Sequence, residues 1–298
     1  MLARATFFSG AYLDRRSDTR DEADWLERAL ADPHTQFLLD RGGAQLWFGE
    51  PRPHIAFVSG RHPAVAGAEA HQFALLGWFQ QRRCVLVMLG AEWQDIDLPA
   101  GAAFHELRAL SAQLAPEEAA LAACARALSV WRARQHYCAV CGAPTASARA
   151  GHSAVCTRAG CAHEFFPRLD PAIIVLVTDG PHALLGRQRT WDAGRYSTIA
   201  GFVEPGESLE DAVRREVMEE TGIQVISARY DGSQPWPFPA SLMVGFQAVA
   251  APGVVRVGRE LEDARWFTRA QLGDGVVRLP PPYSISRQLI DAWLGADP

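Results

Sequence analysis

The chain has 298 residues, 48% of them hydrophobic, which is enough to fill the cores of about two domains. The sequence contains no lysine, so all 29 basic residues are arginines. It also contains no asparagine. These absences exclude a Walker lysine, a Schiff-base lysine, a kinase catalytic-loop asparagine and an N-glycosylation site. The net charge of −5 gives no support to non-specific binding of nucleic acid.

Apolar runs are short throughout the chain. The longest have about six residues, as in Ala172 to Val177, whereas a membrane helix needs roughly 18 to 20. The first 17 residues mix charged and apolar side chains and show no signal-peptide pattern. We therefore expect a cytoplasmic protein with no membrane contact.

The first region, residues 1–133, alternates strand-like and helix-like segments. Cys84 to Leu89 is an apolar run typical of a buried strand, and Glu117 to Arg134 is alanine-rich with apolar residues at helical spacing. Cys84 and Cys124 lie within such apolar segments. We interpret both as buried small side chains and assign them no function.

The second region, residues 134–166, carries four cysteines in the pattern C-x2-C, fourteen residues, C-x4-C: Cys138, Cys141, Cys156 and Cys161. Two knuckles that each present two thiolates can close a tetrahedral Zn²⁺ site. Protein ligands fill all four positions, so we expect the zinc to be structural, with no place for a catalytic water.

Other interpretations of the cysteine region remain open. The four thiols could form two disulfides, and His136, His152 and His163 lie close enough in sequence to be alternative ligands. A zinc ribbon also allows a function without catalysis, as a nucleic-acid-binding adaptor. The nearby arginines that would serve it are Arg132, Arg134, Arg149 and Arg158.

The third region, residues 167–298, predicts a series of short strands and two helices. The run from Ala172 to Val177 is rich in β-branched residues and predicts a central strand. A closing helix is predicted near 285–294. Further strands are predicted at 183–186, 196–200, 225–230, 242–249, 254–257 and 264–267.

A carboxylate-bearing helix is predicted at Leu209 to Thr221. Ser208 is its N-terminal cap, apolar residues follow one stripe, and Gly222 is placed to end it. Glu216, Glu219 and Glu220 are spaced i, i+3, i+4, which brings three carboxylates onto one face. Mg²⁺ or Mn²⁺ would relieve their repulsion, and a solvated acidic face is the alternative.

The surrounding spacing is more specific than the three glutamates alone. It fits the pattern G-x5-E-x7-R-E-U-x-E-E-x-G-U, where U is a bulky aliphatic residue, from Gly201 to Ile223. This pattern is the Nudix box, so the chain resembles the Nudix hydrolases. The resemblance implies an α/β (α+β) fold, an α/β/α sandwich around a mixed sheet. It also implies that Glu216, Glu219 and Glu220 bind metal and activate water, and that Glu207 and Arg215 form a supporting ion pair.

A second motif lies ten residues after the box. It reads Ser-Gln-Pro-Trp-Pro-Phe-Pro-Ala-Ser, from Ser233 to Ser241, and its alternating prolines predict a stiff loop. A proline-rich ligand for another domain is disfavoured, because the P-x-x-P spacing is missing. Together with the four-cysteine ribbon, this motif is similar to that of the NADH pyrophosphatase branch of the Nudix family. The branch implies a degenerate Nudix-like N-terminal domain, a structural zinc ribbon and a homodimer.

The branch also implies the site residues. The catalytic Mg²⁺ or Mn²⁺ ions would be held by the carbonyl of Ala200 and by Glu216, Glu220 and Glu260. The residues expected to bind substrate are Phe166, Phe202, Gln234, Pro235, Trp236, Pro237, Phe238, Pro239, Ala240, Ser241 and Ser286. Phe166 stands where the branch commonly has tyrosine, so the stacking face is kept and the hydroxyl is lost. Ser286 stands where alanine is usual, which affects the contacts expected from the closing helix.

The reaction implied is hydrolysis of the pyrophosphate bond of NADH or NAD, which gives nicotinamide mononucleotide and AMP. Metal ions would neutralise the diphosphate and lower the pKa of the attacking water. Either Glu219 or Glu220 could be the general base. Removal of NAD caps from RNA by the same chemistry is the alternative. A Nudix-fold isomerase is disfavoured, because no cysteine follows Cys161.

Overall fold

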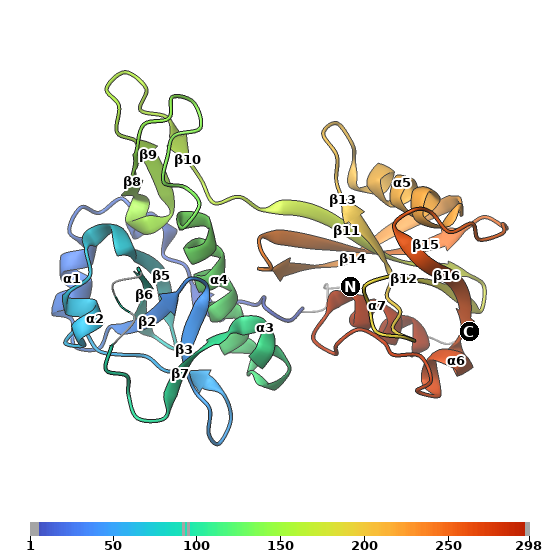
Figure 1. The fold of residues 1–298 in the computed structure, drawn as a ribbon, viewed down its shortest axis with the longest axis horizontal. Coiled ribbons are helices and arrows are strands. Elements are labelled where there is room, and N and C mark those ends of the chain that lie inside the picture. Colours follow the sequence, from blue (N-terminus) through green and yellow to red (C-terminus); the bar gives the residue numbers. More distant parts are fainter. Residues whose placement is uncertain (1–5, 91–92, 94–95, 296–298) are drawn as a thin grey trace. The chain divides into compact units, whose positions relative to one another are not determined.

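The computed structural model describes residues 6–90, 93 and 96–295, and the chain divides into two compact units (Figure 1). The N-terminal unit comprises Phe8–Arg168 together with the short segment Pro237–Ala240. The C-terminal unit comprises Leu169–Trp236 and the segment that begins at Ser241, together with Thr6 and Phe7. No helix in the described parts of the chain is long and apolar enough to cross a bilayer.

The C-terminal unit is built on a six-stranded mixed sheet in the order β14-β15-β11-β12-β16, with β13 paired to β11. The central strand β11 runs parallel to β15 and antiparallel to its other partners. The elements are β11 (Asp170–Asp179), β12 (His182–Gln188), β13 (Ile199–Phe202), α5 (Leu209–Thr221), β14 (Val225–Trp236), β15 (Ser241–Ala250), β16 (Leu261–Thr268), α6 (Arg269–Gly273) and α7 (Ile285–Leu294).

Alternate residues of β11 belong to two different cores. Ile173 and Val175 pack with Val213 of α5, whereas Ile174 and Leu176 pack with residues of α7. A strand that is apolar on both sides is covered on both faces of the sheet. This arrangement confirms the predicted α/β/α sandwich with a mixed sheet.

The N-terminal unit repeats the same strand topology. Its sheet has the order β1-β5-β6-β2-β3-β4, β7 also pairs with β3, and β2 runs parallel to β6. Its elements before the ribbon are β1 (Leu13–Asp14), α1 (Trp25–Ala31), β2 (Gln36–Arg41), β3 (Ala44–Phe48), β4 (His54–Ile55), α2 (Pro63–Ala66), β5 (Phe73–Phe79), β6 (Arg82–Leu89), β7 (Ala102–Glu106), α3 (Leu107–Leu110) and α4 (Pro116–Arg132).

The order β5-β6-β2-β3-β7 matches β14-β15-β11-β12-β16, with the single parallel pair at the same place in both sheets. The place of α5 is taken in the N-terminal unit by the four-residue helix α2, Pro-Ala-Val-Ala, which has no carboxylate. The unit therefore has a Nudix-like sheet without a carboxylate helix, as expected for a degenerate domain.

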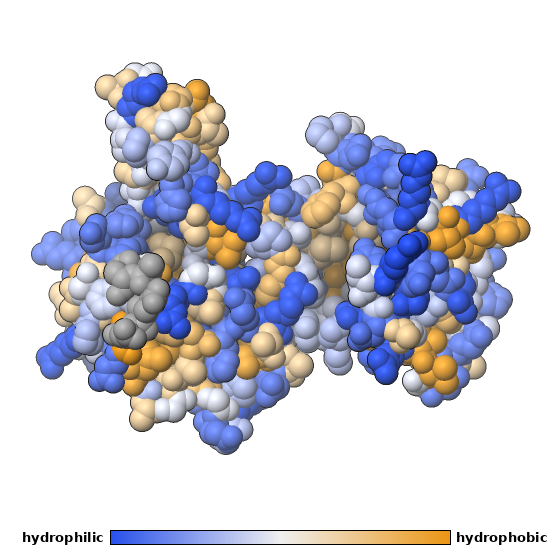
Figure 2. Space-filling view, viewed as in Figure 1, coloured by the Kyte–Doolittle hydropathy of each residue, from blue (hydrophilic) through white to orange (hydrophobic). Residues whose placement is uncertain are grey.

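The ribbon adds a three-stranded sheet in the order β10-β9-β8 to the N-terminal unit. Its strands are β8 (Thr145–Ala148), β9 (Ser153–Cys156) and β10 (Glu164–Phe165). On the face shown in Figure 2, hydrophilic side chains are interspersed with smaller hydrophobic patches on both units.

Most predicted elements are confirmed, and α5 and α7 have the predicted bounds. The strand predicted at 254–257 is wrong. There, the backbone N–H groups of Arg256 and Gly258 donate to the carbonyls of Thr221 and Glu220 at the end of α5, each at 2.8 Å. They are therefore not available to a sheet. The motif predicted as a loop from Ser233 lies in strand β14 as far as Trp236, because β14 is an edge strand and tolerates Pro235.

Candidate active site and zinc centre

The helix α5 begins and ends where its sequence places the caps. The Ser208 hydroxyl accepts a hydrogen bond from the Asp211 N–H at 3.1 Å, and Gly222 takes the left-handed conformation at φ 69°. Val213 and Val217 are fully buried against the sheet. This packing fixes the rotation of the helix, and with it the side of the helix on which its glutamates stand.

Arg215 is the centre of the charged network on α5. Its guanidinium donates two hydrogen bonds to Glu207, at 2.5 and 2.9 Å, and one to the carbonyl of Phe202 at 2.9 Å. It also reaches Glu216 at 2.8 Å and Glu219 at 3.2 Å. These hydrogen bonds from Arg215 lower the pKa of Glu207 to about 2. The expected Glu207–Arg215 ion pair is present, and the hydrogen bond from Arg215 to the Phe202 carbonyl ties α5 to strand β13.

Glu220 has a different environment from Glu207. Its side chain is only 6% exposed, and no arginine among the described residues forms an ion pair with it. Burial, together with the smaller effect of the charges of Glu216, Glu260 and Glu219, raises the pKa of Glu220 to about 8. Burial also raises the pKa of Glu216, to which Glu219 and Glu260 contribute. A buried carboxyl surrounded by carboxylates fits a hard divalent cation that would neutralise them.

Gly201 and Gly258 let the backbone approach these glutamates closely. From the sequence alone, no structural role is predicted for either glycine. A Cβ atom on Gly201 would lie 1.9 Å from the carboxylate of Glu216, and one on Gly258 would lie 2.2 Å from the Glu219 carbonyl oxygen. Gly258 thus holds the segment before Glu260 against the end of α5. The only sequence signal was its position two residues before Glu260.

The carboxylates do not yet converge as metal ligands in the structure. Among the described residues, the four ribbon cysteines are the one group of three or more ligating side chains whose ligand atoms already lie together. Glu216 and Glu219 are turned toward Arg215 instead.

Two residues expected to bind substrate are buried. Gln234 has no exposed surface, and its amide donates to the carbonyls of Phe7 and Tyr283 and accepts from the Ile285 N–H. Ser286 is 3% exposed and bonds the hydroxyls of Ser197 and Thr198 at 2.9 and 2.8 Å. In this structure both side chains anchor the start of α7, and neither has a free polar group for a ligand.

The remaining substrate-loop residues divide between the two units. In the C-terminal unit, Trp236 stacks on Tyr283 with ring centroids 6.4 Å apart. In the N-terminal unit, the Phe238 ring lies under the guanidinium groups of Arg108 and Arg126, at 4.3 and 5.5 Å. Arg126 also donates to the Pro237 carbonyl at 2.9 Å.

The two aromatic residues expected to stack on bases are both exposed. Phe202, on β13, is 60% exposed, and Phe166, just after β10, is 56% exposed. Such exposure of a large ring is unfavourable in water, and a flat ligand that stacks on it removes that surface from solvent.

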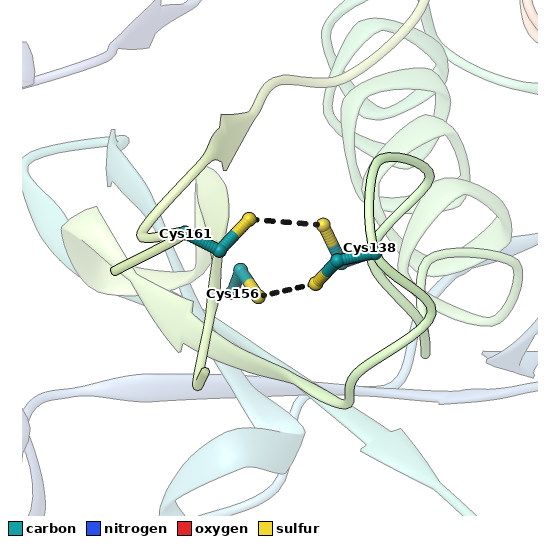
Figure 3. A group of neighbouring side chains, drawn as sticks. Cys138, Cys156 and Cys161 are labelled. Carbon is teal, nitrogen blue, oxygen red and sulfur yellow. Dashed lines mark hydrogen bonds between the residues drawn. The ribbon is translucent and has the colours of Figure 1, made fainter. Parts of the chain in front are cut away.

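The four ribbon cysteines form a pre-arranged metal site. Their sulfur atoms lie within 4.8 Å of one another and point toward a common centre (Figure 3). Cys138 and Cys161 are 3.8 Å apart and Cys141 and Cys156 are 3.5 Å apart, far longer than the roughly 2.05 Å of a disulfide bond. A Zn–S length of about 2.3 Å requires sulfur atoms roughly 3.8 Å apart in a tetrahedron. The site therefore fits structural Zn²⁺, and the disulfide alternative is not supported.

Family models match almost the whole chain. Residues 168–292 match the NUDIX domain, residues 30–131 match the NADH pyrophosphatase-like rudimentary NUDIX domain, and residues 133–166 match the NADH pyrophosphatase zinc ribbon domain. Nudix chemistry depends on a divalent cation, and the ribbon model agrees with the cysteine site.

Characterised relatives match over most of their length. The chain is 33% identical to the NAD-capped RNA hydrolase NUDT12 of Macaca fascicularis, over 98% of this chain and 74% of that protein. It is 43% identical to the NAD-capped RNA hydrolase NudC of Stutzerimonas stutzeri, over 67% and 72%, and 41% identical to NudC of Mycobacterium tuberculosis, over 68% of each. This chain is a Nudix hydrolase and belongs to the NADH pyrophosphatase branch of that family.

Proposed function

We propose that the protein hydrolyses the pyrophosphate bond of NADH or NAD, giving nicotinamide mononucleotide and AMP. The observation that carries this proposal is the buried Glu220, which is surrounded by Glu216, Glu219 and Glu260 with no arginine of its own. Bound Mg²⁺ or Mn²⁺ would supply charge neutralisation and lower the pKa of the attacking water. We propose that Glu216, Glu219, Glu220, Glu260 and the Ala200 carbonyl hold these ions.

The chain's own residues would orient the reaction. Arg215 holds Glu207 and the Phe202 carbonyl, and so keeps α5 in register with the strand that carries Ala200. Glu219 is exposed and bonded to Arg215, whereas Glu220 is buried, so the two candidates for the general base stand in different environments. In the C-terminal unit, Phe202, Trp236 and Ser241 would contact the nucleoside part of the substrate.

Removal of NAD caps from RNA is the second candidate. It is favoured by the relatives above, which are named NAD-capped RNA hydrolases and match between 67% and 98% of this chain. The same bond is cleaved in both substrates. We further propose the division into residues 1–133, 134–166 and 167–298, a homodimer and a cytoplasmic location.

The test is hydrolysis of NADH, NAD and NAD-capped RNA by the purified protein with Mg²⁺ or Mn²⁺ in ¹⁸O water. Mass spectrometry of the products reports both the substrate preference and the phosphorus attacked. Glu220→Gln should lower kcat about 10² to 10⁴-fold, the range for loss of a general base or a charge-neutralising ligand. The matched control is Glu210→Gln, an exposed glutamate in the first turn of the same helix. Equal activity of Glu220→Gln and the wild type would overturn the proposal.

A further inference from the structure

A pocket of about 380 Å³ lies in the N-terminal unit, at the C-terminal end of α4. Its wall combines polar residues from three parts of the chain with the apolar side chains of Met88 and Leu89 at the end of β6. The polar lining includes His71, Ser129, Arg132 and His136. The mechanism proposed above uses none of these residues.

Arg132 is half-buried, its guanidinium lies 5.7 Å from the centre of the Trp131 ring, and two of its three nitrogen atoms lack a hydrogen-bond partner. Its Nε and Nη1 atoms are shielded from solvent and have no hydrogen-bond partner. Burial lowers the pKa of Arg132, and no charged group among the described residues offsets that effect. Burying a charge without a counter-charge is costly, and so such a group usually has an anion beside it.

A purely structural role does not account for Arg132. An arginine in the last turn of a helix can bond the free carbonyl groups there, but the shielded Nε and Nη1 atoms make no such bond. Arg126, two turns earlier on α4, shows the usual solution. It donates to the carbonyls of Gly43 and Pro237 and forms an ion pair with Glu106 at 3.2 Å.

We propose that this pocket binds a phosphate monoester, with Arg132 as its main ligand. A planar guanidinium matches the oxygens of a phosphate with two parallel hydrogen bonds, and the imidazoles of His71 and His136 can add donors. His71 lies 3.3 Å from Glu69, but both side chains are largely exposed there, at 62% and 79%, so water screens the carboxylate. Met88 and Leu89 provide an apolar wall for the organic part of the ligand.

The size of the pocket fits this class of ligand. Sites for small molecules usually have volumes of about 300 to 1,000 Å³, with apolar walls and few polar groups. Nucleotide monophosphates are also the products of the proposed reaction. In this proposal the pocket senses the product on a domain that has no carboxylate helix. The choice of a nucleotide monophosphate as the probe rests on the proposed function, and the rest of the proposal does not.

Equilibrium dialysis with radiolabelled AMP in the presence of Mg²⁺ tests the proposal, because it counts binding sites. We expect two sites per chain in the wild type and one in Arg132→Met, which removes the charge and keeps most of the volume. The matched control Arg134→Met removes an exposed charge two residues away and should retain two sites. Turnover of NADH should stay within about twofold of the wild type in both variants, since neither residue is part of the proposed active site.

Several outcomes would overturn the proposal. One is that the wild type has a single AMP site and that Arg132→Met leaves this site intact. Another is that the Arg134→Met control loses an AMP site as Arg132→Met does. If Arg132→Met does not fold, Arg132→Lys is the second variant. It keeps the positive charge but cannot form the two parallel hydrogen bonds of a guanidinium, and so should weaken AMP binding at one site about tenfold. A crystal of the wild type soaked with AMP that shows no ligand at Arg132 would also refute it. Absence of NADH turnover in the wild type would instead contradict the proposed function.

Discussion

The backbone of Gly201 passes directly beneath the carboxylate of Glu216, so closely that a Cβ atom at position 201 would lie 1.9 Å from the Glu216 Cδ and Oε1 atoms. Gly201 lies on β13 opposite Ile173 of the central strand, and therefore cannot move aside easily. The first glycine of the Nudix box thus makes room for Glu216, the first of the glutamates that we propose to bind metal.

Gly201→Ala should therefore displace Glu216 and lower kcat by about 10²-fold or more, the scale of a lost metal ligand. The fold should persist, because the Glu216 side chain can move outward. Circular dichroism and Mg²⁺-dependent turnover check the two expectations. The control is Gly273→Ala, where the added methyl group meets no atom within 4 Å and φ is ordinary. Full activity of Gly201→Ala would contradict the role of Glu216.

Glu220 should make the stability of the protein depend on pH when Mg²⁺ is absent. Its pKa is raised from 4.5 to about 8 in the native state, so the folded protein holds this proton more tightly than the unfolded chain. The resulting stabilisation is complete below about pH 4.5 and is lost as the pH rises toward 8. Thermal melts of zinc-loaded protein between pH 5 and 8 measure this slope. Glu220→Gln should reduce the dependence of the melting temperature on pH. Added Mg²⁺ should also reduce this dependence, but only in the wild type.

His152 should make the stability of the protein decrease as the pH falls, which is opposite to the effect of Glu220. Burial, aided by the charges of Arg20, Arg15 and Arg149, lowers its pKa from 6.5 to about 4, while its ring bonds the Leu75 carbonyl at 2.7 Å. The unfolded chain therefore binds this proton first, and stability is lost as the pH falls from about 6.5 to 4. In urea titrations over this pH range, the free energy of unfolding of His152→Gln should fall less steeply than that of the wild type. An unchanged slope would show that His152 is not responsible.

Cys138→Ser should lose most of the bound zinc and destabilise the N-terminal unit, because structural zinc contributes about 10 kcal/mol or more in small modules. Elemental analysis after a wash with mild chelator should give one zinc per chain in the wild type and much less in the variant. Cys124→Ser is the control, since Cys124 lies on α4 outside the cluster. Equal zinc content in Cys138→Ser and wild type would refute the four-thiolate site.

Phe202→Ala should weaken the preference for dinucleotides over nucleoside triphosphates. The exposed ring offers stacking of about 1 to 3 kcal/mol to a base, by analogy with single-strand binders. The wild type should therefore cleave NADH or NAD with higher kcat/KM than ATP or dGTP, and the variant should lose much of this advantage. The control is Ile226→Ala, at a similarly exposed residue on β14, which should keep the preference of the wild type for dinucleotides. A wild type that prefers a triphosphate would contradict the proposed substrate.

The sequence alone determined the zinc ribbon, the carboxylate helix and the family, because each depends on local spacing. Cysteines with two or four residues between them, and glutamates at i, i+3 and i+4, lie near one another because of local spacing alone. The bounds of α5 followed in the same way from its caps, Ser208 and Gly222.

Only the tertiary structure decided which of these residues are buried and which face solvent. Gln234 belongs to a motif that predicts substrate contacts, yet its amide is used by Phe7, Tyr283 and Ile285, which are distant in sequence. Burial raises the pKa of Glu220, and the charge of Glu260, 40 positions further on, adds to the effect. The segment before Glu260 bonds the end of α5 instead of forming a strand. Contacts between distant residues set burial and charge, and local spacing does not contain them.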